Sequence, residues 1–234
     1  MSILVVIPTF NEAETITKTI ETLIEHQPDV DILVVDDNSP DGTGELVKEF
    51  RQANPKIHLL SRAKKAGLGS AYLAGFDFGI DRGYQYLVEM DADGSHRPQD
   101  LSKLLAQRES ADLVIGSRWI DGGSVENWPY FRKLVSRIGN RYAKVMLGTK
   151  ISDMTSGFRI FQTPFLERII HPAVSSHGYS FQVELAYRAS KQGRVIEVPI
   201  TFVERVQGKS KMTLAIVLEA LTRVTYWGIR RLLS

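Results

Sequence analysis

The sequence contains no cysteine, which excludes disulfide bridges and thiolate chemistry and leaves the redox compartment undefined. It also contains no charge-free apolar run of about 18 residues, the length that a membrane-spanning helix requires. The N-terminus, Met-Ser-Ile-Leu-Val-Val-Ile-Pro, lacks the basic segment and cleavage site of a signal peptide and has the pattern of a first strand. We therefore expect the chain to stay on the cytoplasmic side.

Further absences narrow the class of function. The five histidines are scattered without the spacing of a metal site, and we interpret His96, beside an acidic turn, as a surface residue. No basic strand interleaved with aromatic residues indicates nucleic acid, so we expect no nucleic-acid partner. The chain has no internal repeat, linker or low-complexity segment.

The charges are distributed unevenly along the chain. The formal net charge of the 234 residues is only +2. Residues 1–37 nevertheless hold eight acids against the single base Lys18, whereas residues 118–150 hold seven bases against two acids. The second half of the chain is therefore expected to meet anions.

Apolar periodicity predicts alternating strands and helices in the first half of the chain. Predicted strands cover residues 3–7, 32–35, 57–60, 86–90 and 113–116, and predicted helices cover residues 12–26, 44–53, 68–80 and 98–108. This alternation indicates an α/β fold, with a Rossmann-like, doubly wound, mainly parallel sheet flanked by helices.

The pattern loosens after Ser117. We predict helices over residues 131–147 and 180–192 and strands over residues 158–161 and 195–200. Residues 213–233 predict an amphipathic C-terminal helix, for which two interpretations are open. It packs on the sheet, or it docks on a partner or a membrane surface with Arg223, Arg230 and Arg231 facing anionic headgroups.

An acidic turn follows the predicted strand 86–90. Asp91 and Asp93 lie one residue apart where Gly94 makes the chain turn, at the edge of an α/β sheet where ligands bind. Two such carboxylates can share one Mg²⁺ or Mn²⁺ with the phosphates of a substrate. The alternative is a solvated turn that caps the next helix.

Seven segments, in chain order, resemble the dolichol-phosphate (polyprenol-phosphate) mannose synthases, which are inverting family 2 glycosyltransferases with the GT-A fold. They are Val5-Val-Ile-Pro-Thr-Phe-Asn-Glu12, Val34-Val-Asp-Asp-Asn-Ser-Pro-Asp-Gly42, Lys65-Ala-Gly-Leu-Gly-Ser-Ala71, Met90-Asp-Ala-Asp93, Gly116-Ser-Arg118, Asp153-Met-Thr-Ser-Gly-Phe-Arg159 and Arg205-Val-Gln-Gly-Lys-Ser-Lys-Met212. The resemblance implies a GT-A catalytic domain over residues 1–212, followed by the C-terminal helix 213–234.

The resemblance also implies a reaction: transfer of a mannosyl residue from GDP-mannose to a polyprenyl (dolichyl) phosphate, giving the β-linked product and GDP. UDP-glucose is the alternative donor. Asp91 and Asp93 would hold Mg²⁺ or Mn²⁺, with Ser95 where the family often has Gln. The donor-binding residues implied are Pro8, Phe10, Glu12, Val35, Asp37, Asp91, Ala92, Asp93, Ser95, Arg118, Arg205 and Lys211.

The implied catalytic residues are Asp93, Arg118, Arg132 and Asp153, and the acceptor phosphate would meet Arg118, Arg132 and Arg159. A lipid phosphate is already anionic near neutral pH, its second pKa being about 6 by analogy with phosphoserine, so its attack needs positioning rather than a base. Asp153 is the fallback base or, alternatively, a helix cap. Arg205 and Lys211 resemble mobile-loop cations that clamp the donor phosphates.

Two other classes of protein stay open. In phosphotransferases of the haloacid dehalogenase type an Asp-x-Asp-Gly motif follows a strand, but there the motif lies near the first strand and a Thr follows the Gly, where this chain has Ser95. The second open class is a non-catalytic nucleotide-binding subunit. For the transferase, the lipid acceptor predicts a peripheral enzyme on the cytoplasmic face of the membrane, held by its C-terminal helix or by a separate anchoring subunit.

Overall fold

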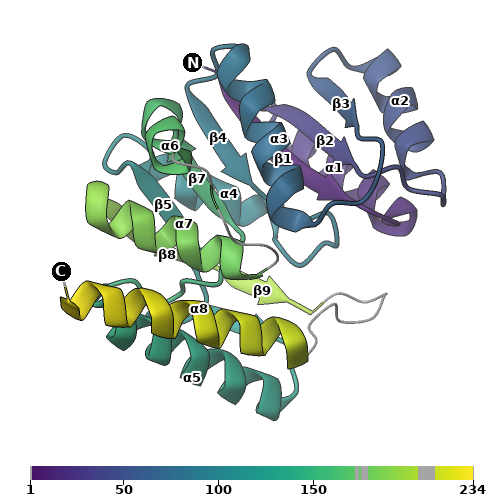
Figure 1. Ribbon diagram of the computed structural model, residues 1–234. Helices are drawn as coiled ribbons and strands as arrows, with labels where there is room; N and C mark the ends of the chain where they lie inside the picture. The colour runs from purple at the N-terminus through teal and green to yellow at the C-terminus, as the bar shows by residue number, and fades with distance from the viewer. Residues whose placement is uncertain (1, 172–173, 175–178, 205–213, 234) are drawn as a thin grey trace.

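The computed structural model describes residues 2–171, 174, 179–204 and 214–233. Its centre is a seven-stranded sheet in the order β3-β2-β1-β4-β7-β5-β8 (Figure 1). The strands are β1 (Ile3–Thr9), β2 (Asp31–Asp36), β3 (Ile57–Ser61), β4 (Tyr86–Glu89), β5 (Leu113–Ser117), β7 (Arg159–Gln162) and β8 (Val195–Pro199). A second sheet pairs β6 (Ser124–Glu126) with β9 (Thr201–Val203) in parallel.

The helices connect these strands in chain order. They are α1 (Ala13–His26), α2 (Thr43–Ala53), α3 (Leu68–Asp81), α4 (Pro98–Gln107), α5 (Tyr130–Leu147), α6 (Thr163–Ile170), α7 (Tyr179–Gln192) and α8 (Leu214–Leu233). The predicted α/β fold with a mainly parallel sheet is confirmed. One strand departs from it, because β7 runs antiparallel to both of its neighbours, β4 and β5.

Both faces of the sheet are buried. Successive side chains of a strand point to opposite faces, so Leu4 and Val6 belong to one core cluster and Val5 and Ile7 to the other. Helices α3, α6 and α7 cover the first face, and α1, α2 and α4 cover the second. Burial on both faces explains why the strands are continuous apolar runs.

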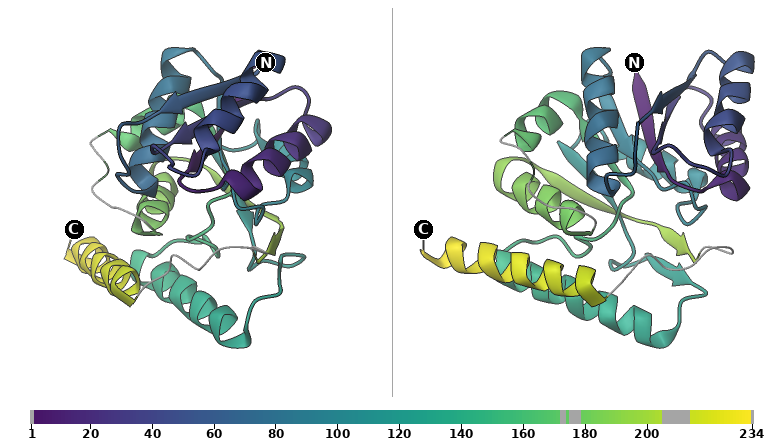
Figure 2. Two further views of the ribbon diagram at one scale, coloured as in Figure 1. Left: turned by 90° about the vertical axis from the view of Figure 1, so that its right-hand side faces the viewer. Right: turned by 45° about the vertical axis from the view of Figure 1, so that its right-hand side comes forward.

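Helices α5 and α8 form a separate layer beyond the sheet (Figures 1 and 2). The hydroxyl groups of Tyr142 and Thr225 lie 2.6 Å apart, and a Cβ atom at Gly228 would lie 2.9 Å from the carbonyl oxygen of Met146. Helix α8 packs on α5 and α7. Its residues Val224 and Trp227 join the core cluster on one face of the sheet, so the helix covers that face together with α5 and α7, and its docking on a partner or a membrane surface stays a prediction.

Two further elements differ from expectation. The strand predicted over residues 195–200 ends at Pro199, and β9 then joins the small sheet with β6. Helix α6, directly after β7, has no predicted counterpart. Among the described residues, no helix combines the length and the apolar character needed to cross a bilayer.

Candidate active site

The acidic turn lies at the carboxyl end of β4, and hydrogen bonds fix its shape. The Tyr72 hydroxyl donates to Asp91 Oδ1 at 3.2 Å, and the Ser95 amide donates to Asp93 Oδ1 at 3.1 Å. Gly94 has a φ of +73°, a left-handed conformation that favours glycine. Both carboxylates are thus oriented before any ligand arrives.

His96 is buried next to the acidic turn and hydrogen-bonds to its backbone. Its Nδ1 accepts the Asp91 amide hydrogen at 3.0 Å, and its ring stacks on Phe158 with 5.0 Å between the centroids. Burial lowers the pKa of His96 to about 4, so the ring is neutral at physiological pH. The prediction of a surface histidine is wrong, because Phe158 and Phe202, distant in sequence, enclose the ring.

One cavity of about 330 Å³ joins this turn to two arginines of the second half of the chain. Its polar end is lined by Asp91, Asp93, Ser95, Arg118 and Arg132, so residues that the sequence separates by up to 41 positions share one space. The apolar remainder of the cavity lies between α5 and α8 and is lined by residues that include Val135, Gly139, Ala143, Leu221 and Val224. The cavity therefore has a charged part and an apolar part.

Arg118 is fixed by Asp153 in the charged part. Its Nε and Nη2 donate to the two carboxylate oxygens, each at 2.7 Å, and its backbone amide donates at 2.9 Å. Burial alone raises the pKa of Asp153, but the charge and hydrogen bonds of Arg118 outweigh it and hold the pKa below its ordinary value. This arrangement counts against Asp153 as a base and makes it the partner that orients Arg118.

Arg132 reaches the same cavity from α5. One of its terminal nitrogens pairs with Glu204, and its guanidinium lies 4.1 Å from the centre of the Trp128 ring. Ion pair and ring contact together hold a long side chain in one position.

Arg159 does not lie where the resemblance implied. Its side chain is fully buried, and its Nε lies 3.8 Å from the equally buried Glu89 on the neighbouring strand β4. Its Nη2 donates to the Met154 carbonyl at 2.9 Å. Burial raises the pKa of Glu89 to about 8. Arg159 is therefore a buried cross-strand partner and does not line the cavity.

The carboxyl ends of β1 and β2 carry several of the residues that the resemblance assigns to donor binding. Asp37 is buried, with its Oδ1 3.1 Å from Arg62 Nη1 and its Oδ2 accepting the Ala66 amide at 3.2 Å. Thr9 and Ser39 donate to the adjacent Asp36. Both of these buried carboxylates therefore have donor partners within the protein.

Five further predicted donor residues lie near this edge. Pro8, Phe10 and Glu12 are partly exposed, and the Nζ of Lys65 lies 4.1 Å from the centre of the Phe10 ring. Val35 and Ala92, however, point into the two core clusters, so their side chains do not face the ligand edge. The expectation that these two side chains bind the donor is therefore wrong. The predicted cations Arg205 and Lys211 lie outside the described residues.

The turn fits a divalent cation that also binds a substrate. Within the described residues, no group of three or more His, Asp or Glu side chains gathers at a metal-binding distance. Asp91 and Asp93 provide two carboxylates, and the buried Ser95 hydroxyl has no hydrogen-bond partner in this part of the chain. Two hard oxygen ligands, completed by phosphate and water oxygens, are a common way to hold Mg²⁺.

A comparison with known protein families decides the class. Residues 4–170 match the family described as Glycosyl transferase family 2. The chain belongs to this family. As a family 2 glycosyltransferase it is an enzyme, and the phosphotransferase alternative is rejected.

Two relatives of this glycosyltransferase match almost its whole length. Undecaprenyl-phosphate mannosyltransferase of Micrococcus luteus is 49% identical over 230 residues, covering 98% of this chain and 95% of the relative. Polyprenol monophosphomannose synthase of Mycolicibacterium smegmatis is 51% identical over 230 residues, covering 97% and 87%.

Solved structures share the fold. Glucosyl-3-phosphoglycerate synthase of Mycobacterium tuberculosis, in complex with Mn²⁺, UDP and glucosyl-3-phosphoglycerate, gives a TM-score of 0.65 at 20% identity over 99% of this chain and 78% of that chain. The mannosyltransferase PcManGT of Pyrobaculum calidifontis, in complex with GDP-Man and Mn²⁺, gives 0.60 at 18% identity over 89% of this chain and 58% of that chain. At these identities the likeness shows the fold alone.

Sequence reasoning missed part of the cavity of this glycosyltransferase. His96, Trp128, Asn140, Thr155 and Phe202 line it without having been predicted. The sequence gives little indication that these residues line a binding site, because single aromatic and amide residues are common in loops and on helix faces. Phe202 lies on β9, a strand of three residues that is too short to show a periodic pattern.

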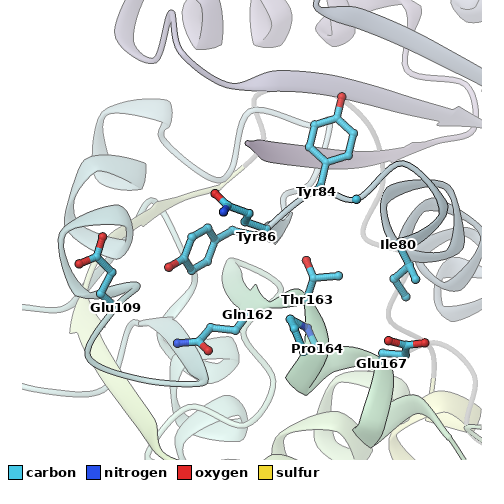
Figure 3. A pocket seen from close by; sticks show the side chains of 10 residues that line it. Ile80, Tyr84, Tyr86, Glu109, Gln162, Thr163, Pro164 and Glu167 are labelled. Atoms are coloured by element: carbon cyan, nitrogen blue, oxygen red, sulfur yellow. The ribbon is translucent and has the colours of Figure 1, made fainter. Parts of the chain in front are cut away.

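A second cavity, of about 540 Å³, lies at the opposite, amino-terminal end of β4 (Figure 3). Its wall includes Tyr84, Tyr86, Gln162 and the acids Glu109 and Glu167, and no Lys or Arg of the described chain lines it. Such a wall repels phosphate groups, unlike the cavity at the carboxyl ends of the strands, which Arg118 and Arg132 line.

Proposed function

We propose that this family 2 glycosyltransferase transfers a mannosyl residue from GDP-mannose to a polyprenyl phosphate and releases GDP. The observation that carries the proposal is the single cavity that joins two carboxylates, two arginines and an apolar channel. A lipid phosphate has the same division into charged head and apolar chain. The names of the two relatives support the mannosyl group and the lipid acceptor.

The donor would bind at the acidic turn with Mg²⁺ or Mn²⁺. Asp91 and Asp93 would hold the cation, and the Ser95 hydroxyl, which lines the same cavity, is a further oxygen ligand that the chain offers. Bound there, the cation neutralises charge on the leaving nucleoside diphosphate. The solved structures with Mn²⁺ support a divalent cation and favour neither metal.

The acceptor would bind with its phosphate at Arg118 and Arg132 and its first isoprene units between α5 and α8. A Cβ atom added at Gly139 would have no neighbour within 4 Å, which leaves an open passage along the apolar wall. The guanidinium groups suit a phosphate because their planar N–H donors match its oxygens.

The reaction needs no general base from the protein. A phosphate oxygen of the lipid attacks the anomeric carbon, and the bond from that carbon to the nucleoside diphosphate oxygen breaks, carrying its electron pair away with GDP. Attack from the opposite side inverts the configuration, so an α-linked donor gives a β-linked product. Asp153 stays ionised and keeps Arg118 in position throughout.

The acceptor lipid also requires contact with a bilayer. In the described chain, every strongly exposed large apolar side chain lies on α5 or α8: Tyr130, Phe131, Leu134, Ile138, Val145, Leu218, Leu221, Tyr226, Ile229, Leu232 and Leu233. We propose that this apolar face rests on the cytoplasmic face of the membrane. The sequence leaves two means of membrane attachment open, the C-terminal helix and a separate anchoring subunit. The apolar face favours attachment through α8 together with α5.

The experiment is a transfer assay with GDP-mannose and UDP-glucose, each with a polyprenyl phosphate and Mg²⁺ or Mn²⁺. We expect turnover of GDP-mannose alone. Exclusive turnover of UDP-glucose would refute the donor, and no transfer from either donor would refute the reaction.

Gly139→Leu tests the acceptor channel separately. The added side chain narrows the passage, so transfer at limiting acceptor should fall at least about tenfold while calorimetric donor binding is unchanged. Lys133→Leu, on the same helix but outside the cavity, is the matched control. Equal activity of the two variants would contradict the channel.

A further inference from the structure

A third cavity, of about 750 Å³, lies on the flank of α5 and is lined by cations. Its wall includes Arg137, Arg141, Lys144 and Arg231, together with the hydroxyl residues Thr149 and Ser152. No Asp or Glu of the described chain lines it. We call it the basic pocket. The proposed reaction uses none of these cations.

The basic pocket and the catalytic cavity lie on opposite faces of α5. Arg137, Arg141 and Lys144 follow one another at spacings of four and three residues and therefore share one helix face. Arg132, Val135 and Gly139 line the catalytic cavity from another face. Asn140 lies in the wall between the two spaces.

Three cations of the basic pocket have no carboxylate partner among the described residues. In the described part of the chain, Arg137, Arg141 and Lys144 form no ion pair with a carboxylate, whereas Arg132 and Arg118 each have one. Like charges four residues apart destabilise a helix. A bound anion would remove this repulsion, so the arrangement favours an anionic ligand.

Local contacts give the basic pocket a defined shape. The Arg137 guanidinium lies 5.0 Å from the centre of the Trp119 ring, and Lys144 Nζ donates to Ser152 Oγ at 3.3 Å. Gly148 ends α5 with a φ of +61°, and a Cβ atom there would lie 1.2 Å from Arg231 Nη1. The glycine thus leaves the space that the Arg231 guanidinium occupies at the end of α5.

The basic pocket opens beside the apolar face of α5 and α8. Val145 lines it and is 68% exposed, and Leu232, the neighbour of Arg231, is 71% exposed. A soluble phosphate gains nothing from an apolar rim, whereas a phospholipid offers a phosphate and acyl chains side by side.

We propose that the basic pocket binds the phosphate of an anionic phospholipid headgroup while the apolar face contacts the bilayer. The inference rests on the proposed membrane attachment. It adds a second phosphate site, distinct from that of the acceptor, and a preference of the enzyme for anionic membranes.

The test is flotation of the full chain with vesicles of phosphatidylcholine alone or mixed with phosphatidylglycerol, at one fixed ionic strength. The pocket variant Arg141→Gln/Lys144→Gln is compared with Lys133→Gln/Lys150→Gln, which removes the same charge nearby but outside the basic pocket. Circular dichroism establishes that both variants fold.

We expect the wild type to prefer the mixed vesicles and the pocket variant to bind them about 30-fold more weakly, the effect of two cations at lipid phosphates. The matched variant should lose about threefold or less, and all three proteins should bind neutral vesicles equally. Equal losses in both variants, or no loss in the pocket variant, would overturn the inference.

Two further results distinguish failure of the proposed membrane attachment from failure of the proposed phospholipid ligand. A wild type that binds neither kind of vesicle refutes the membrane attachment itself. Calorimetric binding of inorganic phosphate without vesicles, if it is saturable and abolished in the pocket variant while the vesicle preference stays, assigns the basic pocket to a soluble anion and overturns the lipid.

Discussion

Replacing Asp153 by Asn tests the ion pair that holds the charged part of the cavity. The substitution keeps the volume but leaves Arg118, only 7% exposed, without the carboxylate that accepts three of its hydrogen bonds. Removing one partner of a buried pair costs about 3–5 kcal/mol. We expect a loss of about 3 kcal/mol, at the lower end, because Arg118 borders a cavity and the Asn oxygen still accepts one bond.

The assay is urea denaturation followed by circular dichroism, with Asp121→Asn in an exposed loop as the control. With a slope of about 2 kcal/mol/M, a loss of 3 kcal/mol moves the midpoint down by about 1.5 M. The control should stay within about 0.5 kcal/mol of the wild type.

The pH dependence gives a second, independent readout. The folded-state pKa of Asp153 lies below its unfolded value, so its contribution is complete above the unfolded pKa of about 3.9 and is lost as the pH falls through the folded pKa. The stability gap between wild type and Asp153→Asn should therefore be constant from pH 7 to pH 5 and shrink at lower pH. A gap under 1 kcal/mol at pH 7, or one that widens on acidification, would refute the reasoning.

Three further predictions concern other parts of the molecule. Asp93→Ala should abolish Mn²⁺-dependent donor binding in calorimetry while the circular dichroism spectrum is unchanged; unaltered Mn²⁺-dependent binding would contradict the metal assignment. Gly75→Ala should lower the free energy of unfolding by about 1–3 kcal/mol in urea, because the new Cβ would lie 2.3 Å from Val6 Cγ1, and a neutral result would argue against this close packing. The double variant Leu218→Ser/Ile229→Ser should weaken flotation with neutral vesicles without changing donor binding, and undiminished flotation would rule out the apolar face as the contact.

Much of the first half of the fold is predictable from local pattern. Strands buried on both faces are short apolar runs, and the intervening helices repeat their apolar residues every three or four positions, so the two are distinct. The acidic turn is predictable for the same reason, because Asp91 and Asp93 directly follow a strand and precede Gly94.

The antiparallel strand β7 is the clearest limit of local pattern. Its four residues have the pattern of a strand, but no local feature of the sequence predicts that this strand inserts between β4 and β5. That insertion pairs Arg159 with Glu89 and removes it from the ligand cavity. The resemblance assigns Arg159 to the acceptor phosphate because of its place in a sequence motif. A motif shows which residues are adjacent along the chain and does not show which are adjacent in space.

By itself, the sequence determined the element types, the acidic turn and the excess of cations in the second half, because these depend on residues within a few positions of each other. Only the tertiary structure decided which cations meet the turn. Arg118 and Arg132 reach its cavity, Arg159 is buried behind it, and the basic pocket on α5 faces elsewhere. The physical reason is that side-chain direction is set by the packing of whole helices and strands, which the local pattern does not record.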